Sequence, residues 1–350
     1  MRILIVRIRQ MGDTILSTPL FNTLRKSFPD AVIDLVVNER IAKLMEGHPA
    51  LNHVFPLTAE DHRNALAYLR RAWTIASKGH YDVVMDMRST MNTLPFSIFA
   101  HAKLRIGLRK PYTKWVFNRF VPNCGSGDMV AHNLLYAEAL KQYGTIIPDH
   151  RVTLHISEEE QQSFDSYLKK EGVKSDRPLV VVGVTAKLDF KRWDETAMTH
   201  LVNRFSNRYP EAQLVFNYAP GEEEAHARKI CSQLEHPERV LIDIQARSPR
   251  ELYALACRST FFFGNEGGAR HIFHAAGVPS FVICAPGSHK STWLPKDEVP
   301  TEGIEPSDLA DAQTLAQMDD ASQYALLTED IVWQRLSSFL DRYPINSTKE

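Results

Sequence analysis

Residues 2–19 read RILIVRIRQMGDTILSTP, an apolar run followed by a turn that holds a glycine and an acid. The run at 3–8 is typical of a buried parallel strand, and the amphipathic stretch at 14–27 is typical of a helix. Open α/β sheets bind ligands in the turn after such a strand, where Gly12 lets the backbone pass close to one. Asp13 can then cap the following helix, bind a ligand or accept a proton.

The same alternation continues along the chain. Apolar, β-branched runs predict further strands at 31–37, 53–57, 81–87, 105–108, 179–185, 213–218, 240–244, 260–264 and 280–285. Amphipathic stretches predict helices at 63–78, 90–102, 195–208, 222–234, 249–257, 269–276 and 328–340. Continuous Val/Ile runs separated by helices indicate parallel sheets covered on both faces. The expected fold class is therefore α/β, with two doubly wound domains that face a cleft.

The length supports two domains, because 350 residues exceed one ordinary core. The pattern restarts after Tyr143, so we place a linker around 145–158 and domains at 1–150 and 151–325. A polar, acidic stretch at 309–322 without a strand pattern separates the second domain from the last helix.

Composition narrows the class of protein. A net charge of -1 argues against a nucleic-acid-binding protein, which usually carries a basic excess. Four cysteines without a CxxC pair fit a reducing compartment and give no zinc or disulfide framework. No apolar run approaches the roughly 20 residues of a membrane helix, and the N-terminal run is too short for a signal peptide. We expect a protein that is made and kept in the cytoplasm.

No GxGxxG or GxxxxGK[ST] motif is present, which removes the two commonest phosphate loops. A different anion site is indicated at 264–271, GNEGGARH, where Gly267 and Gly268 open a predicted helix and leave backbone N–H groups free. Glu266 would repel a bare phosphate but accept hydrogen bonds from sugar hydroxyls. His271 lies one turn further. The alternative is a plain tight turn capped by Glu266, with His271 as a core residue.

Two further segments follow strands of the second half. Lys191, in DFKRW at 189–193, would place a cation against a leaving phosphate, and the alternative is a charged surface turn. Glu222, in APGEEE at 219–224, lies where a ribose or base is held, or it complements the helix dipole. Thr185 ends the first strand of this half and joins the candidate donor-binding residues.

The interval between Asp86 and Asp128 contains no acidic residue. It carries seven cations interleaved with aromatic residues: Arg88, Lys103, Arg105, Arg109, Lys110, Lys114 and Arg119. Phosphates, carboxylates or an anionic membrane surface are the candidate partners, and a solvated loop is the alternative. Arg63 and Arg70, seven residues apart, are expected to share a helix face.

Four of these segments together resemble a known family. The opening 2–31, DFKRW, APGEEE and GNEGGARHIFHAAGVPSFVICAPGS at 264–288 span almost the whole chain in order and spacing. They look like the lipopolysaccharide heptosyltransferases, glycosyltransferase family 9, which are inverting GT-B enzymes of the lipopolysaccharide inner core. The resemblance implies two Rossmann-like domains, with acceptor bound by the first and nucleotide-sugar by the second. It also implies a last helix, in 326–350, that packs back on the first domain.

The resemblance implies roles for individual residues. Asp13 would be the general base and Lys191 the catalytic cation. The implied donor-binding residues are Gly12, Thr185, Glu222, Glu266, Gly267, Gly268 and His271. The implied acceptor-binding residues are Arg63, Arg70, Arg105, Arg109 and Lys110. The donor would be ADP-L-glycero-D-manno-heptose, and the acceptor Kdo-lipid A or Hep-Kdo-lipid A at the inner leaflet of the inner membrane. The resemblance implies no cofactor, no metal and no nucleic-acid partner. It also implies peripheral contact with the inner membrane.

This sequence departs from the family pattern at two places. Glu266-Gly267 stands where the family usually has Asp-Thr, and Asp194 follows Trp193 where the family often has Pro. The first change falls beside the sugar. One alternative is therefore a relative that uses another nucleotide-sugar for lipopolysaccharide, capsule or another surface glycan. The other is a glycan-binding protein of the same fold without catalysis.

Overall fold

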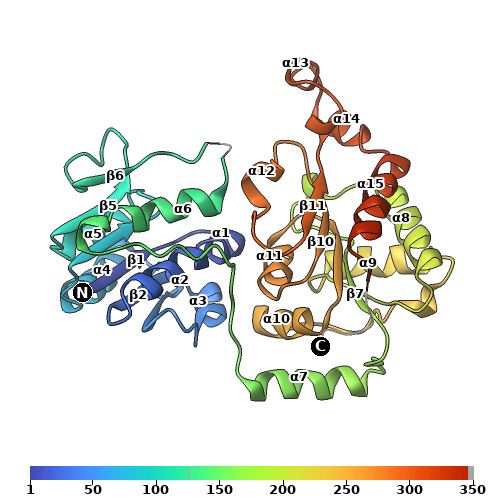
Figure 1. Ribbon diagram of the computed structural model, residues 1–350, viewed down its shortest axis with the longest axis horizontal. Coiled ribbons are helices and arrows are strands. Elements are labelled where there is room, and N and C mark those ends of the chain that lie inside the picture. The colour runs from blue at the N-terminus through green and yellow to red at the C-terminus, as the bar shows by residue number, and fades with distance from the viewer. Residues whose placement is uncertain (126, 346–350) are drawn as a thin grey trace. The chain divides into compact units, whose positions relative to one another are not determined.

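The structure is a computed structural model that describes residues 1–125 and 127–345 (Figure 1). It divides into two compact units, Met1–Ile156 and Ser157–Glu350. Each unit is a parallel sheet with helices on both faces, as the strand and helix pattern predicts.

The sheet of the first unit has six parallel strands in the order β3-β2-β1-β4-β5-β6. Their bounds are β1 (Arg2–Val6), β2 (Val32–Asn38), β3 (His53–Leu57), β4 (Val83–Asp86), β5 (Leu104–Leu108) and β6 (Arg119–Val121). The strand order reverses between β1 and β4, and ligands of such sheets bind outside the carboxyl ends at that point. The turn with Gly12 and Asp13 follows β1, so it lies at this switch point.

The helices of the first unit cover both faces of the sheet. They are α1 (Met11–Ile15), α2 (Thr18–Ser27), α3 (Glu39–Met45), α4 (Ala65–Lys78), α5 (Leu94–Phe99) and α6 (Met129–Glu138), with a 3-10 turn η1 (Lys141–Tyr143). On one face, α4 and α5 bury apolar side chains such as Ile75 and Phe96 against Val6 and Val84. The single helix predicted at 14–27 is two helices, since Pro19 lacks an N–H and is tolerated only in a first turn.

The sheet of the second unit has five parallel strands in the order β11-β10-β9-β7-β8. Their bounds are β7 (Leu179–Gly183), β8 (Gln213–Phe216), β9 (Phe261–Asn265), β10 (Ser280–Ile283) and β11 (Thr301–Ile304). The order reverses between β7 and β9. Gly264 has φ +124° there, and a Cβ on it would lie 2.5 Å from the carbonyl oxygen of Gly183, so only glycine allows this approach. The strand predicted at 240–244 is reduced to one bridge between Leu214 and Val240.

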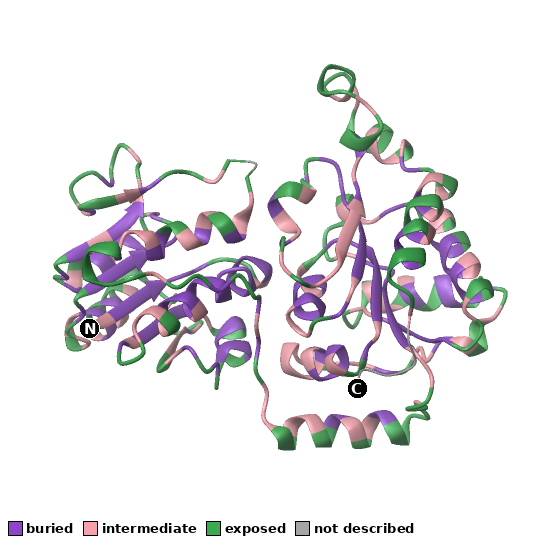
Figure 2. Cartoon of the chain, viewed as in Figure 1, coloured by how far each residue is buried: buried purple, intermediate pink, exposed green. Residues whose placement is uncertain are grey.

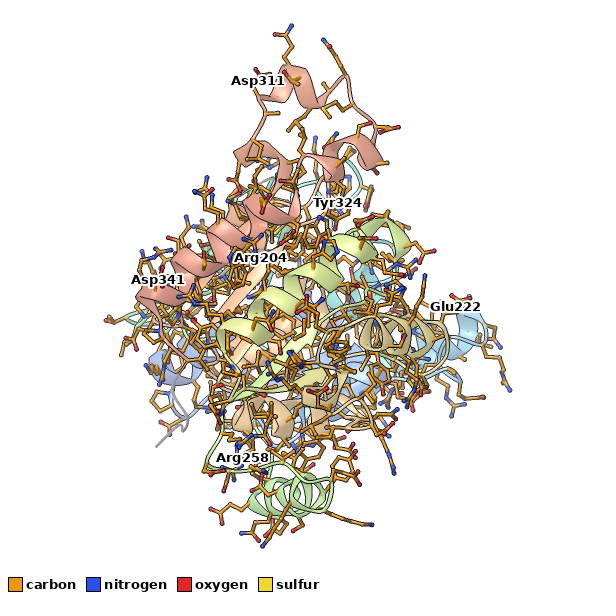
Figure 3. All side chains as sticks on the ribbon, turned by 90° about the vertical axis from the view of Figure 1, so that its right-hand side faces the viewer. Arg204, Glu222, Arg258, Asp311, Tyr324 and Asp341 are labelled. Carbon is orange, nitrogen blue, oxygen red and sulfur yellow. The ribbon has the colours of Figure 1, made fainter. Side chains whose placement is uncertain are left out.

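Nine helices of the second unit are assigned within the described residues: α7 (Glu158–Lys170), α8 (Glu195–Arg208), α9 (Glu222–Ser232), α10 (Pro249–Arg258), α11 (Gly268–Ala275), α12 (Lys290–Trp293), α13 (Ala312–Leu315), α14 (Asp320–Ala325) and α15 (Glu329–Arg342). Three 3-10 turns, η2 (Asp189–Lys191), η3 (Pro237–Arg239) and η4 (Pro306–Asp308), complete the unit. Helix α7 begins where the linker was expected to end, with a capping box between Ser157 and Glu160. Helices α13 and α14 stand away from the sheet, with Asp311 at the tip (Figures 1 and 3).

The last helix packs within the second unit, so our expectation that it returns to the first domain is wrong. Its buried side chains Val332, Leu336 and Phe339 join the core formed by β7, β9 and β10 (Figure 2). On its outer side, Arg204 of α8 lies 2.6 Å from a carboxylate oxygen of both Glu329 and Asp330. The apolar stripe of α15 is therefore buried against the sheet of the second unit.

Candidate active site

Asp13 lies at the third position of α1 and is 4% exposed. The N-cap is Gln10, so Asp13 does not cap the helix as one reading of the sequence had it. Its Oδ1 lies 3.1 Å from Nε of Arg9 and 3.6 Å from Nη2 of Arg7. The position after β1 therefore holds a buried carboxylate between two guanidinium groups.

Arg7 is the residue of this site that sequence reasoning missed. It is 3% exposed, and its guanidinium donates to the carbonyl oxygen of Asp13 (3.1 and 3.3 Å) and to that of Met87 (3.2 Å). Burial lowers the pKa of Arg7 to about 10, and the Asp13 carboxylate opposes this shift. The available signal was a charged residue inside an otherwise apolar run, ILIVRI.

The loop after β4 is held against the same turn. Oδ1 of Asp86 accepts hydrogen bonds from the N–H groups of Arg88 (3.0 Å) and Ser89 (2.7 Å), and Ser89 has φ +52°. Burial raises the pKa of Asp86 to about 6. The Arg88 guanidinium donates to the carbonyl oxygen of Ile8 at 2.7 Å. Strained loops of this kind are common at functional sites, and this one attaches a third arginine, Arg88, to the end of the segment after β1.

The predicted acceptor residues fall into two groups, and the first supports the fold. Arg105 donates to the carbonyl oxygens of Val116 (2.6 Å) and Ala102 (2.7 Å). Lys110 Nζ donates to those of Arg88 (3.0 Å) and Ser89 (2.8 Å), so it stabilises the loop after β4.

The second group is exposed. Arg109 lies over the ring of Phe120, 4.6 Å from its centroid. Arg63 forms an ion pair with Glu60 at 3.2 Å. Because α4 begins at Ala65, Arg63 lies before the helix and does not share a helix face with Arg70, as the spacing had suggested. Arg70 lies on the exposed side of α4.

In the second unit, two predicted residues meet. Nζ of Lys191 lies 2.8 Å from Oε1 of Glu266, and the hydroxyl of Ser288 donates to Oε2 of Glu266. Glu266 is 9% exposed. Tyr324 OH donates to the carbonyl oxygen of Lys191 at 2.9 Å, which ties this turn to α14. Lys191 is therefore part of a positioned ion pair and not of a free surface turn.

The N-terminus of α11 starts beside this ion pair. Gly267 is the N-cap and has no side chain to occupy the free N–H groups of the first turn. A Cβ on Gly267 would meet nothing within 4 Å, so the space in front of the helix is open. Open space, free N–H groups and the positive end of the dipole are the features of a candidate anion site.

His271 lies inside α11 and is 7% exposed. Nη2 of Arg270 lies 2.7 Å from its Nδ1, and since arginine only donates, Nδ1 is the unprotonated nitrogen. Burial, and then the charge of Arg270, lowers the pKa of His271 well below its usual range. The surroundings match the core-histidine alternative.

Thr185 also contacts the acidic run after β8, but through Glu223 and not through the predicted Glu222. The Thr185 hydroxyl donates to Oε2 of Glu223 at 2.8 Å, whereas Glu222 is exposed at the start of α9 (Figure 3). Successive helix residues point about 100° apart, so only one of the two faces the strand end. Glu223 was not among the predicted site residues.

Within 1–125 and 127–345, no group of three or more His, Cys, Asp and Glu side chains could hold a metal ion. The four cysteines, which all lie within the described residues, form no disulfide. In the same part of the chain, no helix has both the length and the apolar character needed to cross a membrane.

A sequence model of the family described as glycosyltransferase family 9 (heptosyltransferase) matches residues 70–303, which is more than half of the chain. The chain belongs to this family. It is a glycosyltransferase of the heptosyltransferase type, as the sequence motifs predicted. The matched region includes Lys191, Thr185 and the α11 site but begins after Asp13.

Known proteins of the family resemble the whole chain. Lipopolysaccharide heptosyltransferase 3 of Escherichia coli K12 is 24% identical over 302 residues, 83% of this chain and 84% of that protein. A glycosyl transferase family 9 structure from Veillonella parvula has a TM-score of 0.84 at 19% identity, over 97% of both chains. E. coli heptosyltransferase WaaC, solved with ADP-2-deoxy-2-fluoro heptose, has a TM-score of 0.72 at 18% identity, over 97% of this chain and 99% of WaaC. The predicted GT-B fold is confirmed by these structures.

Proposed function

We propose that this glycosyltransferase moves a heptose from ADP-L-glycero-D-manno-heptose to an anionic inner-core acceptor, Kdo-lipid A or Hep-Kdo-lipid A. Relatives named lipopolysaccharide heptosyltransferase, and WaaC in complex with an ADP-heptose analogue, support the substrate class. The observation that carries the proposal is the buried carboxylate of Asp13, which is at the switch point after β1 and does not cap its helix. Since the acceptor is lipid-linked, the proposal places the reaction at the cytoplasmic surface of the inner membrane.

On the acceptor side, Asp13 acts as the general base. A carboxylate oxygen takes the proton of the acceptor hydroxyl while the hydroxyl oxygen forms a bond to the anomeric carbon of the donor. Attack opposite the leaving group inverts the anomeric configuration, as in inverting hydrolases. Arg7 and Arg9 hold the carboxylate in place.

On the donor side, the bond between the anomeric carbon and the diphosphate oxygen breaks, and ADP leaves with the electron pair. The free N–H groups at Gly267 and Gly268 and the ammonium group of Lys191 stabilise the charge that develops. Glu266 accepts hydrogen bonds from sugar hydroxyls, and Thr185 with its partner Glu223 lies on the nucleotide side. These roles need no cofactor beyond the donor itself.

The exposed arginines of the first unit, Arg63, Arg70 and Arg109, bind the phosphates or carboxylates of the acceptor. Arg105 and Lys110 contribute indirectly, because their donors are used to hold the chain around β5 and the loop after β4.

Nucleotide release tests the proposal. The purified chain is incubated with ADP-, UDP- or GDP-activated sugars, with and without a Kdo-lipid A acceptor, and the released nucleotide diphosphate is measured. We expect release only from ADP-heptose and only with acceptor. Release from a UDP- or GDP-sugar would change the assignment of the donor but leave the assigned reaction class unchanged. Absence of release from every donor would favour the glycan-binding alternative.

A further inference from the structure

Helix α11 has a buried arginine in its first turn. Arg270 is the third residue of α11 and is 2% exposed, so its guanidinium group lies in the interior of the second unit. Burial lowers the pKa of Arg270 to about 10, which leaves the side chain charged at neutral pH. A cation at the N-terminal end of a helix also opposes the helix dipole. The charge of Arg270 therefore lies where both burial and the dipole disfavour it.

The hydrogen bonds of Arg270 go to uncharged groups. Its Nη2 donates at 2.6 Å to the carbonyl oxygen of Trp293 in α12, which lies beside α11 (Figure 1). The same Nη2 lies 2.7 and 3.5 Å from the two ring nitrogens of His271. Burial keeps the pKa of His271 well below its usual range, so the ring is neutral. Nη1 of Arg270 is buried and has no hydrogen-bond partner in the part of the chain that the structure describes.

Within 1–125 and 127–345, Arg270 forms no ion pair. Two carboxylates act on its pKa from a distance, those of Glu266 and Asp297, and each has a closer basic neighbour. Oε1 of Glu266 lies 2.8 Å from Nζ of Lys191. Oδ2 of Asp297 lies 2.9 Å from Nε2 of His274. The buried guanidinium therefore lacks a carboxylate of its own.

An anion in front of α11 would supply the missing negative charge. The space there is open, because a Cβ on Gly267 would meet nothing within 4 Å. Arg270 follows this opening by three residues, and its guanidinium group is close enough to Glu266 for the two charges to interact. Charges interact more strongly in the interior of a protein than in water. A diphosphate at the opening is therefore attracted by Arg270 without a direct contact.

We propose that Arg270 is a positioning residue of the donor site, whose buried charge attracts the diphosphate of the donor nucleotide to the N-terminus of α11. This role rests on the proposed function, in which that diphosphate binds there. Arg270 acts through its field and through the hydrogen bond that attaches α11 to α12, and it does not touch the phosphates. The inference concerns the diphosphate alone and does not depend on which sugar or base the donor carries.

The test compares the binding of ADP with the binding of adenosine, which carries no phosphate. Arg270→Gln removes the charge and keeps N–H donors for Trp293 and His271, whereas Arg270→Lys keeps the charge. We expect the Kd for ADP to rise about tenfold in Arg270→Gln and to stay within about threefold of the wild type in Arg270→Lys. The Kd for adenosine should be the same in all three proteins. Calorimetry measures ADP, and ligand-detected NMR measures the weaker adenosine.

Two controls separate this effect from a general loss of charge or of structure. Arg335→Gln, on the exposed side of α15, removes the same charge and should bind ADP as the wild type does. Denaturation midpoints without ligand are measured for every variant. Arg270→Gln should unfold at the wild-type midpoint or above it, since the substitution removes a buried charge that has no ion-pair partner. Arg270→Met is a second neutral variant, for use where Arg270→Gln folds poorly.

The outcomes distinguish this inference from the proposed function. Equal ADP affinity of the wild type and the neutral variants would overturn the role of Arg270 and leave the proposed function in place. A parallel loss of adenosine affinity would also overturn it, and so would an equal loss of ADP affinity and stability in Arg270→Lys. If the wild type binds UDP or GDP in place of ADP, the donor assignment changes, and that nucleotide and its nucleoside make the same comparison. Binding of none of the three diphosphates would overturn both.

Discussion

Lys191 Nζ lies 2.8 Å from Glu266 Oε1, and the two residues are 75 positions apart in the chain. The pair stands at the carboxyl edge of the second sheet, beside the free N–H groups of α11. A diphosphate that binds there meets an ammonium group and a carboxylate together, with opposite effects on its affinity.

Substitutions of this pair should therefore change ADP affinity in opposite directions. Lys191→Met removes a cation, and we expect the Kd for ADP to rise about tenfold. Glu266→Gln removes a repelling charge and frees Lys191, so the Kd for ADP should fall about threefold while sugar transfer slows. Titration calorimetry with ADP and initial rates of transfer measure the two effects. Lys187→Met is the control, because Lys187 lies in the same loop and is exposed. Unchanged ADP binding in Lys191→Met would show that Lys191 is not part of the donor site.

Asp13→Asn should slow catalysis strongly and also destabilise the protein. Loss of the general base is expected to slow transfer by about 10²–10⁴-fold. The substitution also leaves the buried Arg7 with one less counter-charge, which costs up to about 3 kcal/mol of unfolding free energy. Transfer rates and denaturation midpoints are measured together.

The double variant Asp13→Asn, Arg7→Met separates the two effects. Removing both buried charges should recover the denaturation midpoint without recovering transfer. If transfer returns together with stability, Asp13 serves only as the counter-ion of Arg7, and the assignment of a general base fails.

Glu223, and not Glu222, should affect nucleotide binding. Glu223→Gln weakens the hydrogen bond from Thr185 and should raise the Kd for ADP about threefold to tenfold. Glu222→Gln, one residue away and exposed, should leave it unchanged. Nucleotide titration of the two variants compares the positions directly, and the reverse order would restore Glu222 to the site.

Stability should depend on pH through Asp86. Its folded pKa of about 6 lies above the ordinary value of 3.8, so the folded state holds a proton that the unfolded state releases between pH 4 and 6. The contribution of Asp86 to stability is therefore fully present below pH 4, is lost as pH rises to about 6, and stays constant above that.

Asp86→Asn keeps an oxygen acceptor for the N–H groups of Arg88 and Ser89 and does not titrate. The denaturation free energy of the variant relative to the wild type should therefore increase between pH 4 and 7, by up to about 3 kcal/mol. Asp30→Asn, at an exposed turn, is the control. A difference that is independent of pH would show that Asp86 is ionised throughout.

Strand and helix periodicity was sufficient for most of the fold. The helix at 195–208 and the strand at 53–57 have the predicted bounds. Asp194 and Glu195 mark the start of the helix, and HVFPL is a short, mainly apolar segment. Family membership also followed from motifs spread along the chain.

The finer errors share one cause: sequence does not show which way a side chain points. On α9, Glu223 contacts Thr185 whereas the predicted Glu222 is exposed. Helix α1 begins at Met11, so Asp13 is an interior residue and the capping alternative does not hold. The apolar stripe on α15 predicted that this helix is buried. It did not show that the sheet of the second unit buries it. The Lys191–Glu266 contact depends on two strands that are neighbours only in the folded sheet.

The packing of α15 has a consequence for synthesis. The core of the second unit begins with β7 at Leu179 and needs Phe339 and Leu340, about 160 residues later. Domains fold in order as the chain is made, at about 5–20 residues per second, so the first unit can complete its sheet while the second still waits. For roughly 8–32 seconds after its synthesis, β7 has no α15 to cover it. The nascent chain should bind chaperones most strongly during this interval, because the apolar strands are then exposed.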